Sequence, residues 1–441
     1  MSTEVTWIAI GSVAGVAAVV VAIYMVFTSH KNDKTNREIV TELRQIKGQI
    51  GQISEYLDGL PQTQDKKKHD LFTKGREAQK AYQYTEAIKL FNKILSMETS
   101  SSEQAALHIL IGNCFAEQSK LDEAAGHYRL AEQAARSDND REGLSAALGN
   151  LGVVYLDKGD PERAKEYHQQ SLQIHKEIGD PLGQADDLVN LGLVQMAKGA
   201  LDRALEHYQQ ALKIYIEMGN RLRQANALGN LGIVYTQKGE LDKALEHHQQ
   251  ALKIDIEIGN RLGQANQLGN LGIVYRRKGD LDKALEHLQQ ALKIDIEIGY
   301  QLGQANQLGN LGNVYMDKGE LDKGLEQYQK AQEIDREIGN PLGQAQNLGN
   351  LGLVYRQKGK LDKALEHHQQ ALEIDRKIGN PLGQAQDLGN LGIVYMDKGE
   401  LDKALEHFQQ ALEIFQEIGA RLDVEKAQKY MELVLKAKEK K

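Results

Sequence analysis

The sequence contains few of the residues that interrupt helices or cross-link small domains. Its 441 residues include five prolines and one cysteine, Cys114, and aromatic residues make up only 5%. One cysteine excludes a disulfide framework within the chain, and we expect Cys114 to be a small buried apolar residue. The chain is instead rich in Ala, Leu, Glu, Lys and Gln, which favour helices. The composition therefore predicts an all-α protein.

Positive charge is also in short supply. The formal net charge is −8 at pH 7, although charged residues make up 26% of the chain. A mildly acidic protein does not attract a phosphate backbone. We therefore do not expect nucleic acid to be a partner.

One long uncharged run lies at the N-terminus, from residue 5 to residue 27. As a helix it would be about 34 Å long, which is enough to cross a hydrocarbon core of about 30 Å. Trp7 and Tyr24 lie near its ends, where amphipathic rings favour the membrane interface. This pattern predicts a transmembrane anchor over residues 1–30.

The charges that flank this run predict its orientation. Three basic residues follow it, namely Lys31, Lys34 and Arg37. Because positive flanks remain on the cytoplasmic side, we predict a single-pass membrane protein with its body in the cytoplasm.

A segment with a heptad pattern follows the anchor and suggests a homodimer. Apolar residues alternate at spacings of four and three, at Ile39, Leu43, Ile46, Ile50, Ile53, Leu57 and Leu60. This pattern predicts a short coiled coil over residues 36–60, or else one amphipathic helix. Gly11 and Gly15 form a GxxxG pair that would also suit a helix dimer in lipid. Residues 61–67 are predicted to be a linker.

The rest of the chain repeats every 40 residues. The block that starts at Leu268 reads LGNLGIVYRRKGDLDKALEHLQQALKIDIEIG, and near copies start at Leu148, Leu188, Leu228, Leu308, Leu348 and Leu388. Each unit predicts two helices joined at a glycine. Helix A has a buried stripe at Leu268, Leu271, Gly272 and Tyr275, and helix B has one at Ala284, Leu288 and Ala291.

These residues resemble the tetratricopeptide repeat (TPR) motif. The period of 40 residues is similar to that of the LGN/Pins group and of kinesin light chains. The resemblance implies a right-handed α-solenoid whose A helices line a concave groove. We predict an array of nine repeats over residues 68–418, with a capping helix over 419–441 that such arrays need for solubility. Three departures from the motif suggest locally looser packing: Ser171, Gln195 and Gly324.

A second face of helix A carries one asparagine in each unit. This asparagine row consists of Asn150, Asn190, Asn230, Asn270, Asn310, Asn350 and Asn390. Asparagine is a mediocre helix former, but its amide can both donate to and accept from the backbone of an extended peptide. In TPR proteins that bind such peptides, this position commonly supplies an asparagine. The alternative is that the asparagines bond to the next repeat and fix its stacking.

Neighbouring residues predict a polar but uncharged groove. Further amides lie one turn earlier, at Asn226, Asn266, Asn306, Gln346 and Gln386, and another lies at Asn313. Apolar contact is offered by Ile233, Ile273, Leu353 and Ile393, and adaptable contact by Met196, Met316 and Met396. One TPR subclass clamps acidic chaperone tails with Lys or Arg. Here the corresponding positions hold Gly229, Gly269, Gly309, Ile233 and Ile273, so that clamp is absent.

Other chemistry is not expected from the sequence. Five histidines recur with the repeat, at His207, His247, His287, His367 and His407. Equivalent positions in packed helices lie about 8–10 Å apart, whereas zinc ligands lie about 2 Å from the ion. We therefore predict neither a metal site nor a cofactor. No phosphate loop or catalytic triad stands apart from the repeats, so the protein is not predicted to be an enzyme.

The sequence thus predicts a membrane-anchored scaffold that binds extended segments of partner proteins in the groove. Two alternatives remain open. The array could self-assemble as a structural protein, or it could be exported and serve envelope assembly or secretion.

Overall fold

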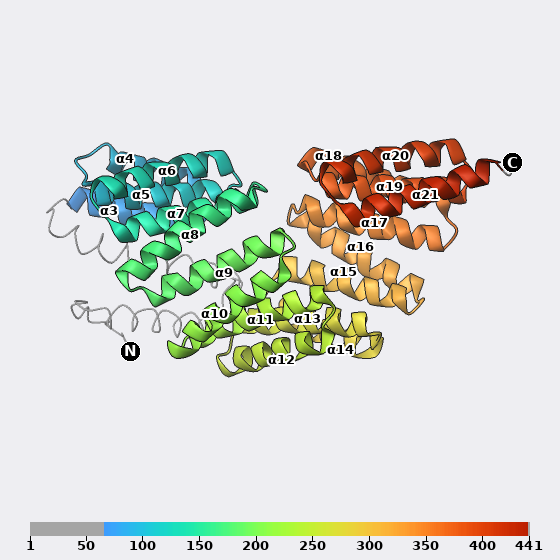
Figure 1. Cartoon of the computed structure of the whole chain (residues 1–441), viewed down its shortest axis with the longest axis horizontal. Helices are drawn as coiled ribbons and strands as arrows, with labels where there is room; N and C mark the ends of the chain where they lie inside the picture. The colour runs from blue at the N-terminus through green and yellow to red at the C-terminus, as the bar shows by residue number, and fades with distance from the viewer. Residues whose placement is uncertain (1–65, 440–441) are drawn as a thin grey trace, which may run out of the picture.

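The computed structural model describes residues 66–439, which form nineteen helices. They make nine consecutive pairs, α3/α4 to α19/α20, followed by a final helix, α21 (Figure 1). The helices are α3 (Lys66–Lys80), α4 (Tyr84–Leu95), α5 (Ser101–Ala116), α6 (Leu121–Ser137), α7 (Arg141–Asp157), α8 (Pro161–Ile178), α9 (Pro181–Ala197), α10 (Leu201–Glu217), α11 (Arg221–Lys238), α12 (Leu241–Glu257), α13 (Arg261–Lys278), α14 (Leu281–Glu297), α15 (Gln301–Asp317), α16 (Leu321–Glu337), α17 (Pro341–Gln357), α18 (Leu361–Ile378), α19 (Pro381–Asp397), α20 (Leu401–Glu417) and α21 (Arg421–Glu439).

The turns explain why the helices break where they do. Gly279 and Gly299 end α13 and α14 with φ angles of 83° and 67°, in the left-handed region that glycine adopts without strain. Asn260 caps the N-terminus of α13, because its side chain accepts a hydrogen bond from Gly263 N at 3.1 Å. Helix A therefore begins at Arg261, seven residues before the block that starts at Leu268.

Small residues let the two helices of a pair approach closely. A Cβ placed on Gly272 of α13 would lie only 2.5 Å from Cγ of Leu288 on α14. Ala284, Leu288 and Ala291 are fully buried, as the helix B stripe predicts. In helix A, Leu268 and Leu271 are buried, whereas Tyr275 is half-buried.

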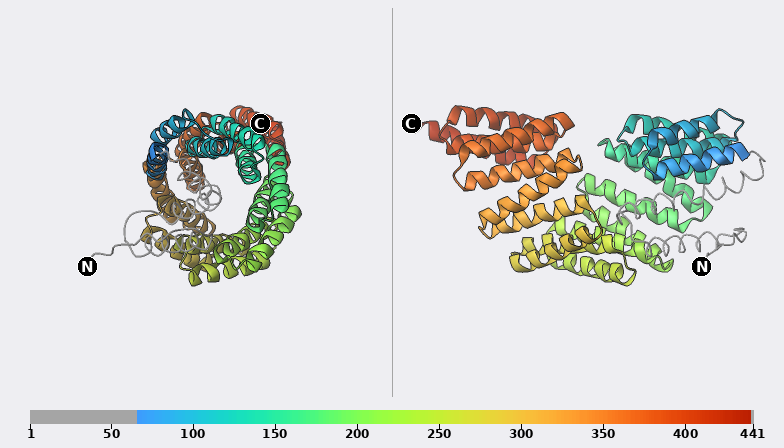
Figure 2. Two further views of the ribbon diagram at one scale, coloured as in Figure 1. Left: turned by 90° about the vertical axis from the view of Figure 1, so that its left-hand side faces the viewer. Right: turned by 180° about the vertical axis from the view of Figure 1, so that it is seen from behind.

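The pairs stack into a curved array with an inner and an outer layer. Figure 2 shows the helices surrounding a central opening when the array is viewed end-on. Successive odd-numbered helices contact one another more closely than successive even-numbered helices do, for example α11 with α13 and α13 with α15. The odd-numbered A helices therefore form the inner layer, and the B helices form the outer one.

One exposed ion pair recurs between successive pairs of helices. Lys318 near the end of α15 lies 2.6 Å from Asp282 at the start of α14, thirty-six residues earlier. Exposed pairs contribute little stability individually. The equivalent pairs are Lys158–Asp122, Lys198–Glu162, Lys238–Asp202, Lys278–Asp242, Lys358–Asp322, Lys398–Asp362 and Lys438–Asp402.

The last of these pairs shows that α21 occupies the place of an A helix. Its residues differ where a B helix would pack, since Glu425, Gln428 and Glu432 stand where α19 has Ala385, Leu388 and Gly392. All three polar residues are exposed. The sequence of α21 thus ends the apolar interface, as a solenoid cap requires.

The predicted fold class needs one correction. No helix within residues 66–439 combines the length and the apolar character needed to cross a membrane, because each buries one stripe and carries polar or charged residues elsewhere. The predicted anchor (1–30), with its Gly11/Gly15 pair, and the predicted coiled coil (36–60) lie outside the described residues. The fold is therefore restated as an all-α solenoid, and the prediction of a single-pass membrane localisation is not retained.

The three departures from the motif have different consequences. Ser171 is fully buried, and its hydroxyl donates to the carbonyl of Ser145 at 3.1 Å. Gln195 is buried with its Oε1 atom unpartnered, which costs stability. Gly324 of α16 stands where the equivalent position of neighbouring B helices holds a fully buried alanine.

We expect Gly324→Ala to stabilise the array by about 1 kcal/mol, because glycine in a helix interior is less favourable than alanine by about that amount. The added Cβ would lie 3.3 Å from the Gly312 carbonyl and 3.4 Å from Met316 Cγ, so only a small adjustment is needed. The thermal midpoint measured by circular dichroism should rise. A lower midpoint would show that this pair of helices cannot accept the methyl group.

Candidate peptide-binding groove

The asparagine row lies on the inner layer, one residue on each of α7, α9, α11, α13, α15, α17 and α19. All seven side chains are half-buried. None of the seven makes a side-chain hydrogen bond to any residue of the described part of the chain. Within α13, Asn270 is flanked by the buried residues Leu271 and Val274. The row therefore consists of half-exposed amides that are not bonded within the described part of the chain.

The amides one turn earlier extend this polar surface. Asn226 is half-buried, and Asn266, Asn306, Gln346 and Gln386 are exposed. No side-chain hydrogen bond joins any of these five residues to another residue between positions 66 and 439. Together with the asparagine row, they form a band of unused amides along the inner layer.

Asn313 has a different role from the asparagine row. Its Oδ1 atom accepts a hydrogen bond from the Tyr328 hydroxyl at 2.7 Å, and Asn113 accepts from Tyr128 at 2.6 Å in the same way. Burial raises the pKa of both tyrosines, so the hydroxyls remain donors. The Asn313 carbonyl oxygen is thus used to join α15 to α16.

An apolar row runs beside the asparagine row, three residues further along every A helix from α7 to α19 except α15, which holds Asn313 there. Val153, Leu193 and Ile233 are exposed by 42%, 42% and 38%. The later members are half-buried, namely Ile273, Leu353 and Ile393. Met196, Met316 and Met396, one turn further along, are half-buried too. The two rows give the inner surface alternating amide and aliphatic groups.

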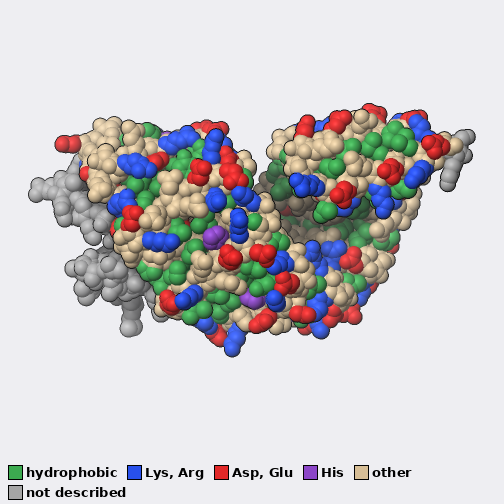
Figure 3. Space-filling view, in the orientation of Figure 1, with side chains coloured by type: hydrophobic (Ala, Val, Ile, Leu, Met, Phe, Trp, Pro, Cys, Tyr) green, Lys and Arg blue, Asp and Glu red, His purple; other side chains and the backbone are tan. Residues whose placement is uncertain are grey.

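The central part of this surface carries little free charge. Asp186 of α9 is partnered, because it accepts from the Tyr215 hydroxyl at 2.6 Å and pairs with Arg223. Charges gather near the C-terminal ends of the A helices, where two arginines each pair with an aspartate of the next A helix. These pairs are Arg276–Asp317 and Arg356–Asp397, each at 2.6 Å. Figure 3 shows the hollow between the two ends of the array.

The stacking of successive repeats depends on residues three positions before the asparagine row. Gln267 lies against Gly229 of the preceding A helix. A Cβ placed on Gly229 would lie only 2.8 Å from the Nε2 atom of Gln267. Gln267 also accepts a hydrogen bond at 2.9 Å from Nδ1 of His248, on the preceding B helix. The equivalent residues, which we call the stacking residues together with Gln267, are Asp187, Gln307, Asn347 and Asp387, all buried.

In these repeats it is the stacking residues, and not the asparagine row, that make hydrogen bonds to the preceding repeat. Asn347 donates at 2.8 Å to Asp335, and Gln307 donates at 3.3 Å to Asp295, in each case reaching the preceding B helix. Buried polar contacts between these repeats therefore come from this position. Sequence reasoning missed them, although a polar residue three places before five of the seven asparagines of the row was a visible signal.

The histidines fall into two groups that the sequence did not separate. His247, His287, His367 and His407 contact a tyrosine of helix A, with ring centroids 4.9–5.0 Å apart. His168, His248 and His368 are instead fully buried between repeats. Within residues 66–439, no three His, Cys, Asp or Glu side chains are grouped so that they could hold a metal ion. Cys114 is buried as expected, and burial raises the pKa of its thiol to about 12.

Comparison with known families identifies the repeats. A tetratricopeptide repeat model matches residues 102–177, 143–217, 184–257, 223–297 and 304–377, and two further models with the same description match residues 385–417 and 270–337. The chain therefore belongs to the tetratricopeptide repeat family, a class of protein-binding scaffolds, which confirms the prediction. One 40-residue period corresponds to one helix pair.

Several solved structures share the fold. They include the apo form of the quorum sensor NprR from B. thuringiensis, at 12% identity and a TM-score of 0.57, covering 79% of this chain and 98% of that one. Aspartyl phosphate phosphatase F from Bacillus subtilis matches at 12% identity and a TM-score of 0.55, and the match covers 79% of this chain and 93% of that one. A Rap protein complexed with competence and sporulation factor matches at 15% identity and a TM-score of 0.53, and the match covers 84% of this chain and 98% of that one. The likeness concerns the fold alone. No curated protein matches the sequence.

Proposed function

We propose that this chain is a protein–protein interaction scaffold that holds extended segments of partner proteins along its inner surface. The observation that carries the proposal is the asparagine row. Seven half-buried amides recur at one helix position, and none of them has a hydrogen-bond partner in the described part of the chain. Polar groups in such places usually find a partner. The backbone of an extended peptide supplies both the donors and the acceptors that they lack.

The apolar row supplies the second part of recognition. An extended chain turns alternate side chains in opposite directions, so amides can bond its backbone while aliphatic side chains receive its apolar residues. Ile233 and Ile273 offer such contacts on consecutive A helices, and Met316 offers an adaptable one. The groove is therefore suited to neutral segments that contain apolar residues.

The similar folds are consistent with binding as the role of the array. One of them was determined as a Rap protein complexed with competence and sporulation factor. Another bears the name of a phosphatase, but at 12% identity that name does not transfer to this chain. We infer that the protein works by binding, not by catalysis.

An affinity capture tests this function. The full chain, a variant with Asn230, Asn270 and Asn310 replaced by alanine, and a control variant would each be used to capture proteins for mass spectrometry. The control replaces exposed amides of the outer layer, Gln209, Gln369 and Gln409. We expect one set of proteins to be lost with the groove variant alone. Identical sets with all three proteins would show that partners bind elsewhere.

A further inference from the structure

Each pair of helices packs against the next through a contact between its B helix and the following A helix, which we call a joint. In the joint between α12 and α13, Asp255 Oδ1 accepts a hydrogen bond from Asn260 at 2.7 Å. Gln267 Oε1 accepts one from Nδ1 of His248 at 2.9 Å. All four side chains are buried. In this joint, both of these oxygen atoms therefore have a donor.

The next joint, between α14 and α15, lacks both of these donors. Forty residues further along the chain, Leu288 stands in place of His248, and Tyr300 stands in place of Asn260. Leucine has no donor, and the Tyr300 side chain makes no capping bond to α15 such as the one that Asn260 makes to α13. The two joints thus differ at both positions that supply a donor.

Two buried oxygen atoms of the α14–α15 joint are left without a donor. Asp295 of α14 and Gln307 of α15 correspond to Asp255 and Gln267, and they are 1% and 6% exposed. Gln307 Nε2 donates to Asp295 Oδ2 at 3.3 Å. The other oxygen of each group, Asp295 Oδ1 and Gln307 Oε1, has no hydrogen-bond partner in the part of the chain that the structure describes. Because a buried acceptor without a donor is costly, these two atoms mark the place of one missing donor.

A protonated carboxyl group has the donor that this joint lacks. Such a group donates through one oxygen and accepts through the other, and a carboxamide likewise has a donor and an acceptor. The two groups can therefore be joined by two hydrogen bonds that run in opposite directions. One of these bonds is present, from Gln307 Nε2 to Asp295 Oδ2. The two unpartnered oxygens are the atoms that the second bond would join, so a single proton satisfies both.

We propose that a proton bound to Asp295 closes the joint between α14 and α15, by donating from Asp295 Oδ1 to Gln307 Oε1. The proton comes from water and returns to it, so the joint is held by two hydrogen bonds when the proton is bound and by one when it is released. Asn270 of α13 and Asn310 of α15 lie on the two sides of this joint. Proton release therefore loosens the middle of the inner surface, although the joint itself does not depend on the proposed function.

The surroundings of Asp295 favour the protonated form. Burial raises the pKa of Asp295 to about 7, and the bond from Gln307 is the contribution that lowers it. Arg261 of α13 pairs with Glu297, and Lys293 is exposed. The first charged residue of α15 is Asp317, at its far end, which pairs with Arg276. The titratable groups at this end of α13, α14 and the turn, and across the neighbouring pocket on α16, are Arg261, Lys293, Glu297, Tyr300, Lys330, Glu333 and Glu337.

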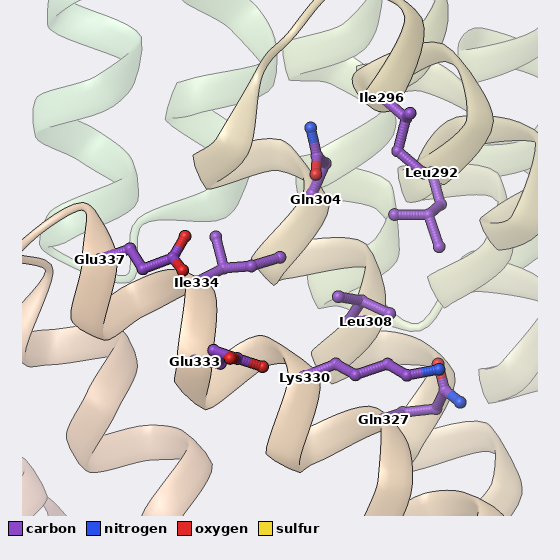
Figure 4. Close-up of a pocket in the computed structure, with 9 residues that line it drawn as sticks. All are labelled: Leu292, Ile296, Gln304, Leu308, Gln327, Lys330, Glu333, Ile334 and Glu337. Carbon is purple, nitrogen blue, oxygen red and sulfur yellow. The ribbon is translucent and has the colours of Figure 1, made fainter.

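A pocket between α14, α15 and α16 brings solvent to the edge of this joint (Figure 4). Its volume is about 440 Å³, and Gln304 of α15 lines it together with Leu292 and Ile296 of α14. The Gln304 side chain donates to the backbone carbonyl of Asp295 at 3.1 Å. The pocket therefore ends one side chain away from Asp295, which allows the proton to exchange with water.

Hydrogen exchange of the full chain at pH 6 and pH 8, read by mass spectrometry, tests this proposal. A carboxyl group with a pKa of about 7 in the closed joint and about 3.9 in the open one should change the protection about tenfold between these pH values, after correction for intrinsic exchange. The α12–α13 joint is the internal standard, because the pKa of Asp255 is about 6 and predicts a change of about twofold. We therefore expect a selective loss of protection in α14 and α15 at pH 8.

Exchanging the donors between the two joints gives matched variants. Leu288→His with Tyr300→Asn supplies both donors to the α14–α15 joint and should reduce its change to about twofold. His248→Leu with Asn260→Tyr removes them from the α12–α13 joint and should raise the change there to about tenfold. Asp295→Asn keeps a donor beside Gln307 at every pH and should abolish the change in α14 and α15.

Three results would overturn the proposal. Equal protection of α14 and α15 at pH 6 and pH 8 would assign the two oxygens to another ligand, such as a bound water molecule. An undiminished change in the variant with Leu288→His and Tyr300→Asn would show that the missing donors are not its cause. A change that persists in Asp295→Asn would show that another group titrates. Circular dichroism would check the folding of each variant, and Asp295→Asn decides the question if an exchanged variant does not fold.

Discussion

Replacement of Asn230, Asn270 and Asn310 by alanine is expected to weaken the binding of a captured partner peptide about 100-fold or more. Each lost amide removes one or two hydrogen bonds to the peptide backbone, at about 1 kcal/mol net for each bond. Three positions on consecutive A helices would act on one stretch of peptide, and every 1.4 kcal/mol is a factor of ten in Kd. Isothermal titration calorimetry with a peptide from a captured partner measures the change.

The same replacement should leave the array as stable as the wild type or slightly more stable. The three asparagines make no side-chain hydrogen bonds within the described part of the chain, so removing their amides breaks no contact there. Alanine is also the better helix former, by up to about 0.7 kcal/mol per residue. A lowered thermal midpoint would show that the row stabilises the stacking. Unchanged affinity with unchanged stability would remove the row from the binding site.

Replacement of Asp295 by asparagine is expected to stabilise the protein more at pH 8 than at pH 5. Asp295 of α14 is 1% exposed, its Oδ1 atom has no partner, and burial raises its pKa to about 7. The turn that follows α14 explains why Asp295 lacks a partner. Asp255 on the preceding B helix accepts a hydrogen bond from Asn260 at 2.7 Å, and its pKa is raised only to about 6. Tyr300 stands at the position equivalent to Asn260, so Asp295 lacks that donor.

The sign of the effect follows from the two pKa values. An unfolded aspartate titrates near 3.9, so the folded protein binds this proton more tightly than the unfolded chain does. The stabilisation by the bound proton is complete at low pH and is lost as the pH rises from about 4 through about 7. At pH 8 the wild type therefore contains a buried, poorly solvated carboxylate. Asparagine avoids this cost, which we expect to be on the order of 2 kcal/mol.

Thermal midpoints at pH 5 and pH 8 measure this difference. The Asp295→Asn variant should gain on the wild type mainly at pH 8. Tyr300→Asn is a useful companion, since it restores the donor and should lower the pKa of Asp295, which would also stabilise the protein at pH 8. Equal differences between wild type and variant at both pH values would mean that Asp295 titrates as it does in water.

Much of the fold could be predicted from local pattern. The buried stripe at Leu268 and Leu271 and the small residues Ala284 and Ala291 appear directly in the sequence, because a helix places every third or fourth residue on one face. The sequence block begins at Leu268, whereas α13 begins seven residues earlier, at Arg261. The capping role of Asn260 depends on a hydrogen bond to Gly263, and that signal was overlooked beside the stronger apolar pattern.

The candidate site was predicted less completely. The sequence places the asparagine row on one face of helix A, but it does not say whether those amides bond the next repeat or remain available. Gln267 and Asn347 fill the space between repeats and meet His248 and Asp335. Residues so far apart in the chain come together only when successive pairs have packed. Asn313, predicted for the groove with the row, proved to accept a bond from its own helix pair.

The sequence by itself determined the repeat, the two helices of each unit and the family, because these depend on residues within about forty positions of one another. Only the tertiary structure decided which polar residues are consumed by stacking and which remain unused. It also decided that Asp295 is buried without the donor given to Asp255. Each of these facts depends on the distance between neighbouring repeats, which is set by packing and does not appear in the chain's periodicity.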